Sequence, residues 1–186
     1  MFVRWVGMVV LALMSTGAFA DVQSELDWQH YPVRINEGET LAQALDRSSP
    51  IRSRGLVFHA TTDWQVQWRF WWRRTSDGCV IERVRTEVEV QIQVPQLVAG
   101  TDAQQAEFAD YLSALTQHEE GHQQLALAAG EAIDLALRQF PVADSCAALE
   151  TDANALGQQL LQRFREREFD YDRRTNHGQT QGAWME

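Results

Sequence analysis

Residues 62–73 read Thr-Asp-Trp-Gln-Val-Gln-Trp-Arg-Phe-Trp-Trp-Arg, and Ser76-Asp77-Gly78 follows closely. From Trp64 on, apolar residues occupy the even positions of this stretch, and polar residues occupy the odd positions up to Trp71. A similar alternation runs from residue 80 to residue 94. A period of two is typical of a strand with one buried and one solvated face, and Ser-Asp-Gly is a turn signal. The sequence therefore predicts a long antiparallel hairpin over residues 62–94.

The tryptophans of this hairpin allow two interpretations. Exposed indoles in a row could form a platform that binds glycan or peptide. The strict period of two instead favours a buried core, because alternate residues of a strand face the same side. Trp71 breaks the alternation, so we expect it to be the exposed aromatic residue.

A long helical pattern follows the hairpin. Residues 101–104 form a capping box, and the apolar face runs to Phe140, where Pro141 stops it. A helix of about forty residues is unusually long, so Gly121 and Gly130 leave room for a break.

Three weaker elements complete the pattern. Residues 26–35 read as a strand that Pro32 confines to an edge, and residues 40–47 and 146–169 read as helices. The sheet and the helices each have an apolar side that the other can cover. We therefore expect one α+β domain over residues 21–186, with an antiparallel sheet packed against helices.

Residues 117–125, Gln-His-Glu-Glu-Gly-His-Gln-Gln-Leu, lie inside the long helical pattern. A helix advances about 100° per residue, so His118 and His122 lie about 40° apart and about 6 Å apart along the axis. Glu119 lies between them. Two imidazoles and an adjacent carboxylate that can act as general base are typical of a zinc hydrolase. Apolar residues continue the same face, which turns the pair inward and disfavours a chance pattern on a solvated helix.

Catalytic zinc needs a third protein ligand, and the residues leave its identity open. We favour His177, which lies in a polar segment that closes on Gly178. Asp172 is the best substitute in that segment, and Glu150 lies on the following helix. The alternative is that residues 171–186 form a frayed terminus. The other candidates are His30, His59 and Glu131, of which Glu131 faces away if the helix is unbroken.

Residues 1–20 have the features of a secretory signal peptide. Arg4 precedes an apolar run over residues 6–14, and Ala18-Phe19-Ala20 is a cleavage signal. The apolar run is too short to span a bilayer, and no cysteine follows the cleavage site. We therefore expect an exported protein, periplasmic or secreted, with no membrane span after cleavage.

Charge and cysteines fit export. All 16 basic residues are Arg; without Arg4, 15 remain against 26 acidic residues, a net charge of −11. Such a chain has no electrostatic basis for binding nucleic acid or anionic lipid. In an oxidising compartment we expect Cys79 and Cys146 to form a disulfide between the sheet and the helices, rather than two buried thiols.

Several of these features together resemble a bacterial family of unknown function that is described as predicted secreted zinc-dependent proteases. The resemblance covers about residues 24–184. It depends on the exported leader, the tryptophan-rich hairpin and its Gly-Cys, the His-Glu-x-Gly-His element and the second Cys. It also depends on the closing segment Tyr-Asp-x-x-Thr-x-His-Gly-x-x-x-Gly-Ala, which contains Tyr171, Asp172, Thr175, His177 and Gly178.

The resemblance implies a zincin-like metallopeptidase with Zn²⁺ as cofactor. His118, His122 and His177 would hold the metal, and Glu119 would be the general base for water attack on a peptide carbonyl. Tyr171 would steady the oxyanion. We further expect Asp172 to orient a ligand imidazole.

Two alternatives stay open. The first is a non-enzymatic envelope protein with a closed metal site, and the second is a module whose tryptophans bind glycan or peptide. For the enzyme, a peptide or protein substrate is expected; an envelope or cell-wall substrate is suggested by export alone.

Overall fold

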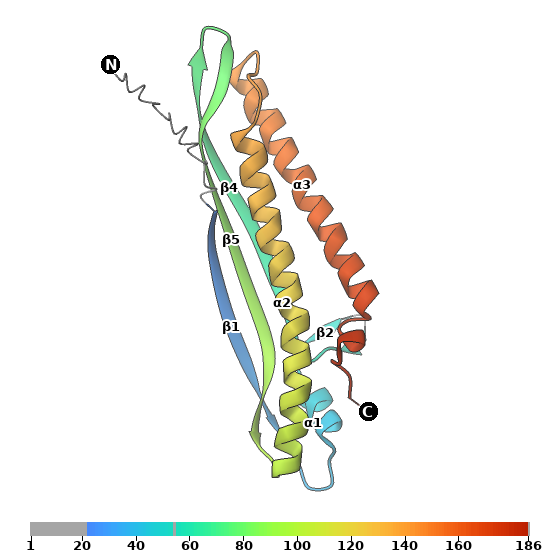
Figure 1. The fold of residues 1–186 in the computed structure, drawn as a ribbon. Coiled ribbons are helices and arrows are strands. Elements are labelled where there is room, and N and C mark those ends of the chain that lie inside the picture. The colour runs from blue at the N-terminus through green and yellow to red at the C-terminus, as the bar shows by residue number, and fades with distance from the viewer. Residues whose placement is uncertain (1–21, 54, 186) are drawn as a thin grey trace, which may run out of the picture.

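The computed structural model describes residues 22–53 and 55–185, so the predicted leader lies outside the described residues. The elements in chain order are β1 (Val22–Arg34), α1 (Leu41–Ser48), β2 (Arg52–Ser53), β3 (Leu56–Val57), β4 (Thr61–Thr75), β5 (Gly78–Ala99), α2 (Asp102–Arg138), α3 (Cys146–Thr175) and the short 3₁₀ helix η1 (Gln179–Gln181). The molecule is an elongated α+β structure in which α2 covers one face of a three-stranded sheet and α3 packs on α2 (Figure 1).

The predicted hairpin is confirmed. Strands β4 and β5 pair antiparallel from Thr75↔Gly78 to Thr61↔Gln93, and β5 continues past Pro95. The register shifts between Trp71 and Trp72, where the alternation breaks. The prediction of an exposed Trp71 is wrong: its ring lies under the guanidinium of Arg83, 3.6 Å from the centroid, and is half-buried. Its neighbour Trp72 is 39% exposed.

The sheet is mixed, which corrects the antiparallel sheet expected from the sequence. Its order is β1-β5-β4, and β1 pairs parallel with β5. The segment that contains α1, β2 and β3 reverses the chain, so β4 runs opposite to β1. Strand β5 lies between them and is therefore parallel to β1. Helix α3 lies beside the outer edge of β4, and Arg165 of α3 donates a hydrogen bond to the carbonyl of Trp64 at this edge.

Helix α2 is continuous over 37 residues. It begins at Thr101, where the capping box with Gln104 forms as predicted, and neither Gly121 nor Gly130 breaks it. Gly130 faces β5, where an added Cβ would overlap a methyl group of Val88. Small residues therefore let α2 lie close to the sheet.

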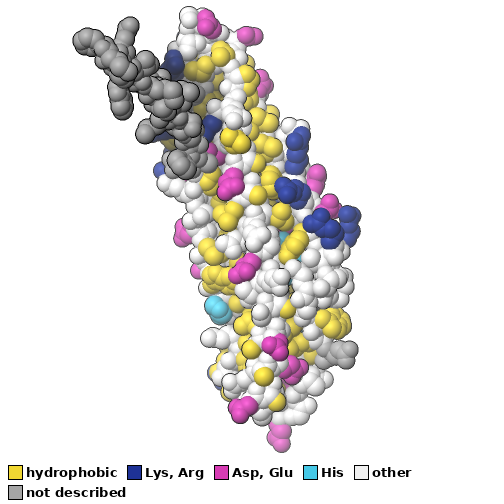
Figure 2. Space-filling view, viewed as in Figure 1, with side chains coloured by type: hydrophobic (Ala, Val, Ile, Leu, Met, Phe, Trp, Pro, Cys, Tyr) yellow, Lys and Arg dark blue, Asp and Glu magenta, His cyan; other side chains and the backbone are white. Residues whose placement is uncertain are grey.

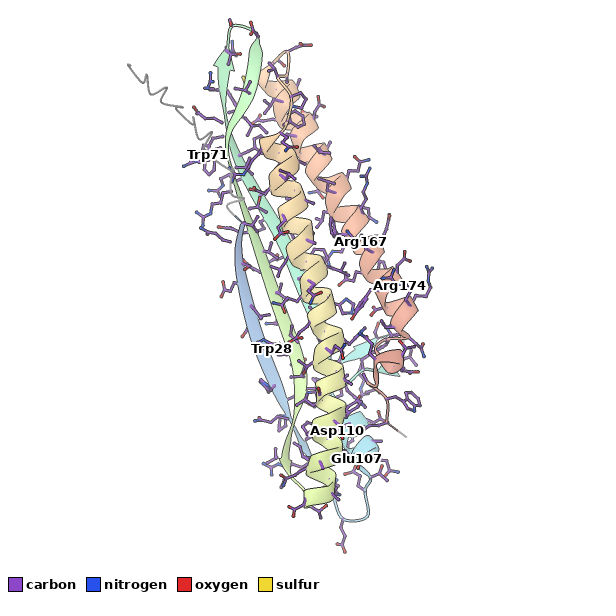
Figure 3. All side chains as sticks on the ribbon, in the orientation of Figure 1. Trp28, Trp71, Glu107, Asp110, Arg167 and Arg174 are labelled. Atoms are coloured by element: carbon purple, nitrogen blue, oxygen red, sulfur yellow. A yellow bond between two sulfur atoms is a disulfide. The ribbon has the colours of Figure 1, made fainter. Side chains whose placement is uncertain are left out.

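Helix α3 is longer than predicted and ends at Thr175, so Tyr171 and Asp172 are helical. Arginine side chains gather over its outer face (Figure 2), and Arg167 and Arg174 point outward in Figure 3. The predicted disulfide between Cys79 and Cys146 is present and joins the start of β5 to the start of α3. Among the described residues, no helix is long and apolar enough to cross a membrane.

Trp64 and Trp68 of β4 pack into the core rather than form an open platform. The side chain of Trp64 is buried, and that of Trp68 is partly buried. Each indole N–H on this face donates a hydrogen bond to a side chain of α3: Trp64 to Glu168, Trp68 to Asn154 and Trp72 to Glu150.

Candidate metal centre

Helix α2 carries His118, Glu119 and His122, and all three side chains are buried. Only 4% of His118 and 6% of His122 is exposed. Their spacing of four residues places both imidazoles on one face of the helix, as the sequence predicts. Their Nε2 atoms lie 3.3 Å apart.

Helix α3 adds a carboxylate to this pair. Oδ1 of Asp172 lies 3.3 Å from Nε2 of His118 and 3.0 Å from Nε2 of His122. The side chain of Asp172 is 26% exposed, so it forms the solvent side of the group. These three residues are the group of His and acidic side chains, within the described part of the chain, that could hold a metal ion.

The other ring nitrogen of each histidine points away from this group. Nδ1 of His118 donates to Oε1 of Gln181 at 2.9 Å. Nδ1 of His122 is buried without a hydrogen-bond partner among the described residues, and Oε1 of Glu168 lies 3.5 Å from it. Both imidazoles are therefore oriented with Nε2 toward Asp172.

Glu119 is anchored to the sheet. Its Oε2 accepts a hydrogen bond of 2.7 Å from the hydroxyl of Thr62 on β4. Burial raises the pKa of the Glu119 carboxyl above its ordinary value, although the hydrogen bond from Thr62 opposes this effect. A carboxylate with a raised pKa is a better proton acceptor near neutral pH.

Hydrogen bonding controls the charges around the histidines. Burial disfavours the His122 imidazolium, but the hydrogen bond to Asp172 and the nearby carboxylate of Glu168 raise the pKa of His122 to about 9. Burial likewise disfavours the charged form of Asp172, yet hydrogen bonds to the two histidines hold its pKa well below the usual value. The pKa of Glu168 is also lowered, because the neighbouring His122 ring and hydrogen bonds from Trp64 and Arg165 outweigh burial.

Tyr171 packs against both imidazoles. Its ring stacks on that of His118 with the ring centroids 5.1 Å apart. It meets the ring of His122 edge-on, with the centroids 5.0 Å apart. Its hydroxyl donates to the backbone carbonyl of His118 at 3.2 Å, and Gln181 donates to it at 3.2 Å. These contacts position the histidine; the expected role of Tyr171 at an oxyanion stays a prediction. Gly121 makes room for the ring, because an added Cβ would overlap the hydroxyl.

The structure does not bring His177 into the group of donors. Its Nδ1 lies 3.7 Å from Oδ2 of Asp172, and its side chain is 53% exposed. Asn176 and His177 both have positive φ angles, 48° and 51°, and Gly178 follows with 84°. This left-handed run reverses the chain and packs Gly178 against the ring of His118.

The remaining candidates for a third ligand lie elsewhere. His59 contacts Tyr111 at 2.6 Å and Asp46 at 2.9 Å, and Glu150 accepts from Trp72. His30 and Glu131 are exposed, and Glu131 faces away from the histidines on the unbroken helix, as expected.

Sequence reasoning missed Glu168, Thr62 and Gln181. One signal could have found Glu168: it precedes Asp172 by four residues, the same spacing as the two histidines on α2. Two helices that carry such pairs can face each other with all four side chains. Thr62 and Gln181 have no comparable local signal.

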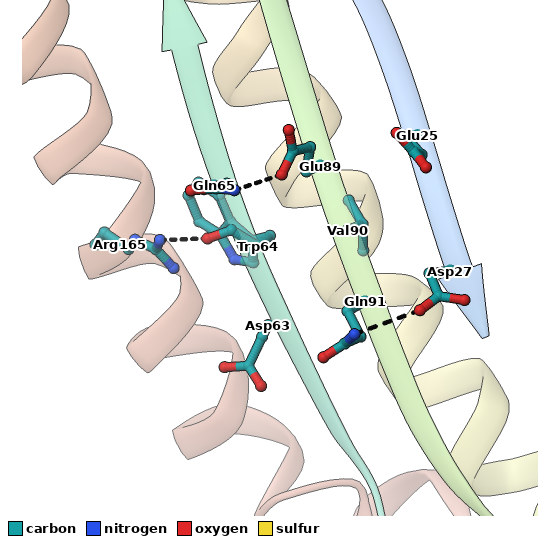
Figure 4. Close-up of a pocket in the computed structure, with 9 residues that line it drawn as sticks. All are labelled: Glu25, Asp27, Asp63, Trp64, Gln65, Glu89, Val90, Gln91 and Arg165. Atoms are coloured by element: carbon teal, nitrogen blue, oxygen red, sulfur yellow. Dashed lines mark hydrogen bonds between the residues drawn. The ribbon is translucent and has the colours of Figure 1, made fainter. Parts of the chain in front are cut away.

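A groove on the opposite face of the sheet does not contain the candidate metal donors. Its walls include carboxylates from all three strands: Glu25, Asp27, Asp63 and Glu89 (Figure 4). Trp64 and Arg165 also line it. An acidic sheet face of this kind is the solvated side that a one-sided sheet requires.

The donor spacing fits zinc. Tetrahedral zinc with bonds of about 2.0–2.1 Å to nitrogen and oxygen places its ligand atoms about 3.3 Å apart. The separations between the Nε2 atoms and Oδ1 of Asp172 are 3.0–3.3 Å. Two imidazoles whose Nδ1 atoms face acceptors, together with one carboxylate, are a donor set that zinc accepts.

Comparison with protein families gives one match. The sequence model of a bacterial protein family of unknown function, DUF922, matches residues 28–178. The chain belongs to this family. The part of the chain that the DUF922 model matches includes the two histidines, Glu119, Asp172 and His177. Gln181 lies beyond it. Searches of curated proteins and of solved structures gave no match.

Proposed function

We propose that this protein is an exported zinc-dependent peptidase in which His118, His122 and Asp172 hold the metal. The observation that carries the proposal is the convergence of three donor atoms at 3.0–3.3 Å from one another. Asp172 takes the place that the sequence assigned to His177, because α3 continues far enough to bring it to the histidines.

The chemistry follows from the groups around the site. Zinc in such a site supplies Lewis-acid chemistry, which lowers the pKa of a coordinated water and polarises a carbonyl group. Glu119 accepts a proton at its carboxylate and returns it to the leaving amine, a role that its burial favours. Tyr171 and Gln181 hold the ring of His118 in place.

Three protein donors, one fewer than a structural zinc site has, support catalysis over a purely structural role. Asp172, whose side chain is 26% exposed, is the most exposed of the three donors. A structural zinc site has four protein ligands and no open position. The disulfide between Cys79 and Cys146 is typical of a protein exported to an oxidising compartment.

The first experiment is metal analysis of purified residues 21–186 beside three variants, His122→Ala, Asp172→Ala and His177→Ala. We expect one zinc per chain in the wild type, loss of zinc in the first two variants and retention in His177→Ala. Hydrolysis of fluorescein-labelled casein would then be measured with Glu119→Gln as the blank, which should keep zinc and lose activity.

Each outcome decides a separate point. Absence of zinc from the reconstituted wild type would refute the metal site. Loss of zinc only in His177→Ala and His122→Ala would restore His177 as the third ligand. Full activity in Glu119→Gln would remove the assignment of the base, and zinc without hydrolysis would favour a non-enzymatic metal protein.

A further inference from the structure

The Nδ1 atom of His122 has an unusual environment. It is buried and has no hydrogen-bond partner among the described residues. Nε2 of His122 faces Asp172 at 3.0 Å. A histidine that gives its Nε2 lone pair to a metal carries its proton on Nδ1. A buried N–H needs an acceptor. The nearest charged acceptor is Oε1 of Glu168, at 3.5 Å.

Glu168 is held in place from two sides. The indole N–H of Trp64 donates to its Oε1 at 2.7 Å, and Arg165 contacts its Oε2 at 3.2 Å. Arg165 also donates to the backbone carbonyl of Trp64 at 2.6 Å (Figure 4) and stacks on the indole, 3.6 Å from the ring centroid. Trp64, Arg165 and Glu168 therefore support one another, and the carboxylate is fixed beside His122.

We propose that Glu168 is a positioning residue for His122, and that Trp64 and Arg165 hold its carboxylate in position for this role. The inference rests on the proposed metal site. Nδ1 and Oε1 lie 3.5 Å apart, and a hydrogen bond between them would fix the tautomer and make Nε2 a stronger donor. The indole at position 64 thus serves the site as well as the core.

The two histidines have different supports. His118 donates to the neutral amide of Gln181, whereas His122 faces a carboxylate. A carboxylate partner increases the basicity of an imidazole more than an amide does. Strand β4 supports the site twice, because Thr62 binds Glu119 and Trp64 binds Glu168 two residues later on the same face.

The test compares zinc dissociation constants, measured by competition with a chelating dye. We expect Glu168→Ala to raise the constant by about 10- to 100-fold, the range found when partners of ligand histidines are removed. Glu168→Gln keeps an acceptor without charge and should have a smaller effect. Trp64→Phe removes the indole donor and should also weaken zinc binding.

Trp68→Phe is the matched control. It removes an indole N–H that binds Asn154 on the same helix, away from the histidines. We expect its zinc affinity to equal that of the wild type. Nitrogen-15 spectra should place the His122 proton on Nδ1 in the zinc-bound wild type and show a changed Nδ1 signal in Glu168→Ala, which a loss of general stability would not produce.

The outcomes separate the two proposals. A wild type without zinc refutes the metal site itself. A wild type that binds zinc, beside Glu168→Ala and Glu168→Gln with unchanged affinity, overturns the role of Glu168 alone. Equal weakening in Trp64→Phe and Trp68→Phe would show that the indoles act only through packing and would overturn the role of Trp64.

Discussion

The hydroxyl of Thr62 donates a hydrogen bond of 2.7 Å to the carboxylate of Glu119 and so connects β4 to the middle of α2. This bond favours the ionised carboxylate and limits the effect of burial on its pKa. A residue of the sheet therefore lowers the pKa of Glu119, the residue that we propose as general base.

Thr62→Val removes this hydrogen bond and nearly preserves the side-chain volume. Since the hydrogen bond lowers the pKa of Glu119, its loss should raise that pKa further. We expect the acid limb of kcat/KM for casein hydrolysis to move to higher pH, with zinc content unchanged. An acid limb that stays in place would show that Glu119 does not control it.

The zinc-free protein should lose stability as pH rises. Burial disfavours the His122 imidazolium, but the hydrogen bond to Asp172 and the nearby carboxylate of Glu168 raise the pKa of His122 from 6.5 to about 9. The stabilisation is complete below pH 6.5 and is lost as pH rises through about 9. Zinc displaces the same proton, so the increase in Tm on adding zinc should grow over this window.

Thermal unfolding between pH 6 and pH 10, with and without zinc, measures both trends. His122→Ala serves as the control and should show neither of them. A Tm of the zinc-free wild type that does not fall across this range would contradict the assignment.

Gly121→Ala should damage both stability and the site. The new Cβ overlaps the hydroxyl of Tyr171, and overpacking of this kind costs roughly 1–3 kcal/mol, only partly offset by helix propensity of about 1 kcal/mol. Because Tyr171 stacks on His118, its displacement should also weaken zinc binding. Gly157→Ala is the control: its Cβ would lie 2.7 Å from a ring carbon of Trp68, so it should reduce stability without changing zinc affinity.

The disulfide should stabilise the fold without being needed for metal binding. Cys79 and Cys146 are 67 positions apart, and closing a loop of that length is worth about 4 kcal/mol in the chain-entropy account. For a domain of this size, the double variant Cys79→Ala/Cys146→Ala should lower Tm by about 8–16 °C. Calorimetry measures the loss; an unchanged Tm would show that the bridge adds nothing to stability.

Local patterns predicted much of the fold. The hairpin follows from the alternation around Trp64 and from the turn before Gly78, and α2 follows from the capping box at Thr101. The pairing of β1 has no such local signal, because its partner β5 lies far along the chain and either direction buries the same side chains.

The candidate metal site was predictable only in part. The spacing of His118 and His122 is a property of one helix and can be read directly. The third donor depends on where α3 ends, and the arginine-rich outer face hides the helical pattern near Asp172. His177 looked suitable because a polar segment after a helix resembles a loop, yet the left-handed turn leaves its side chain half in solvent.

The candidate metal donors come from two helices, and this affects the order in which the protein can fold and bind metal. The histidines belong to α2, but Asp172 belongs to α3 and meets them only when the helices pack. Helix α3 begins at Cys146, which the disulfide ties to the sheet. An unfolded chain therefore offers two imidazoles without their third partner. Tight metal acquisition would therefore wait until α3 has packed on α2.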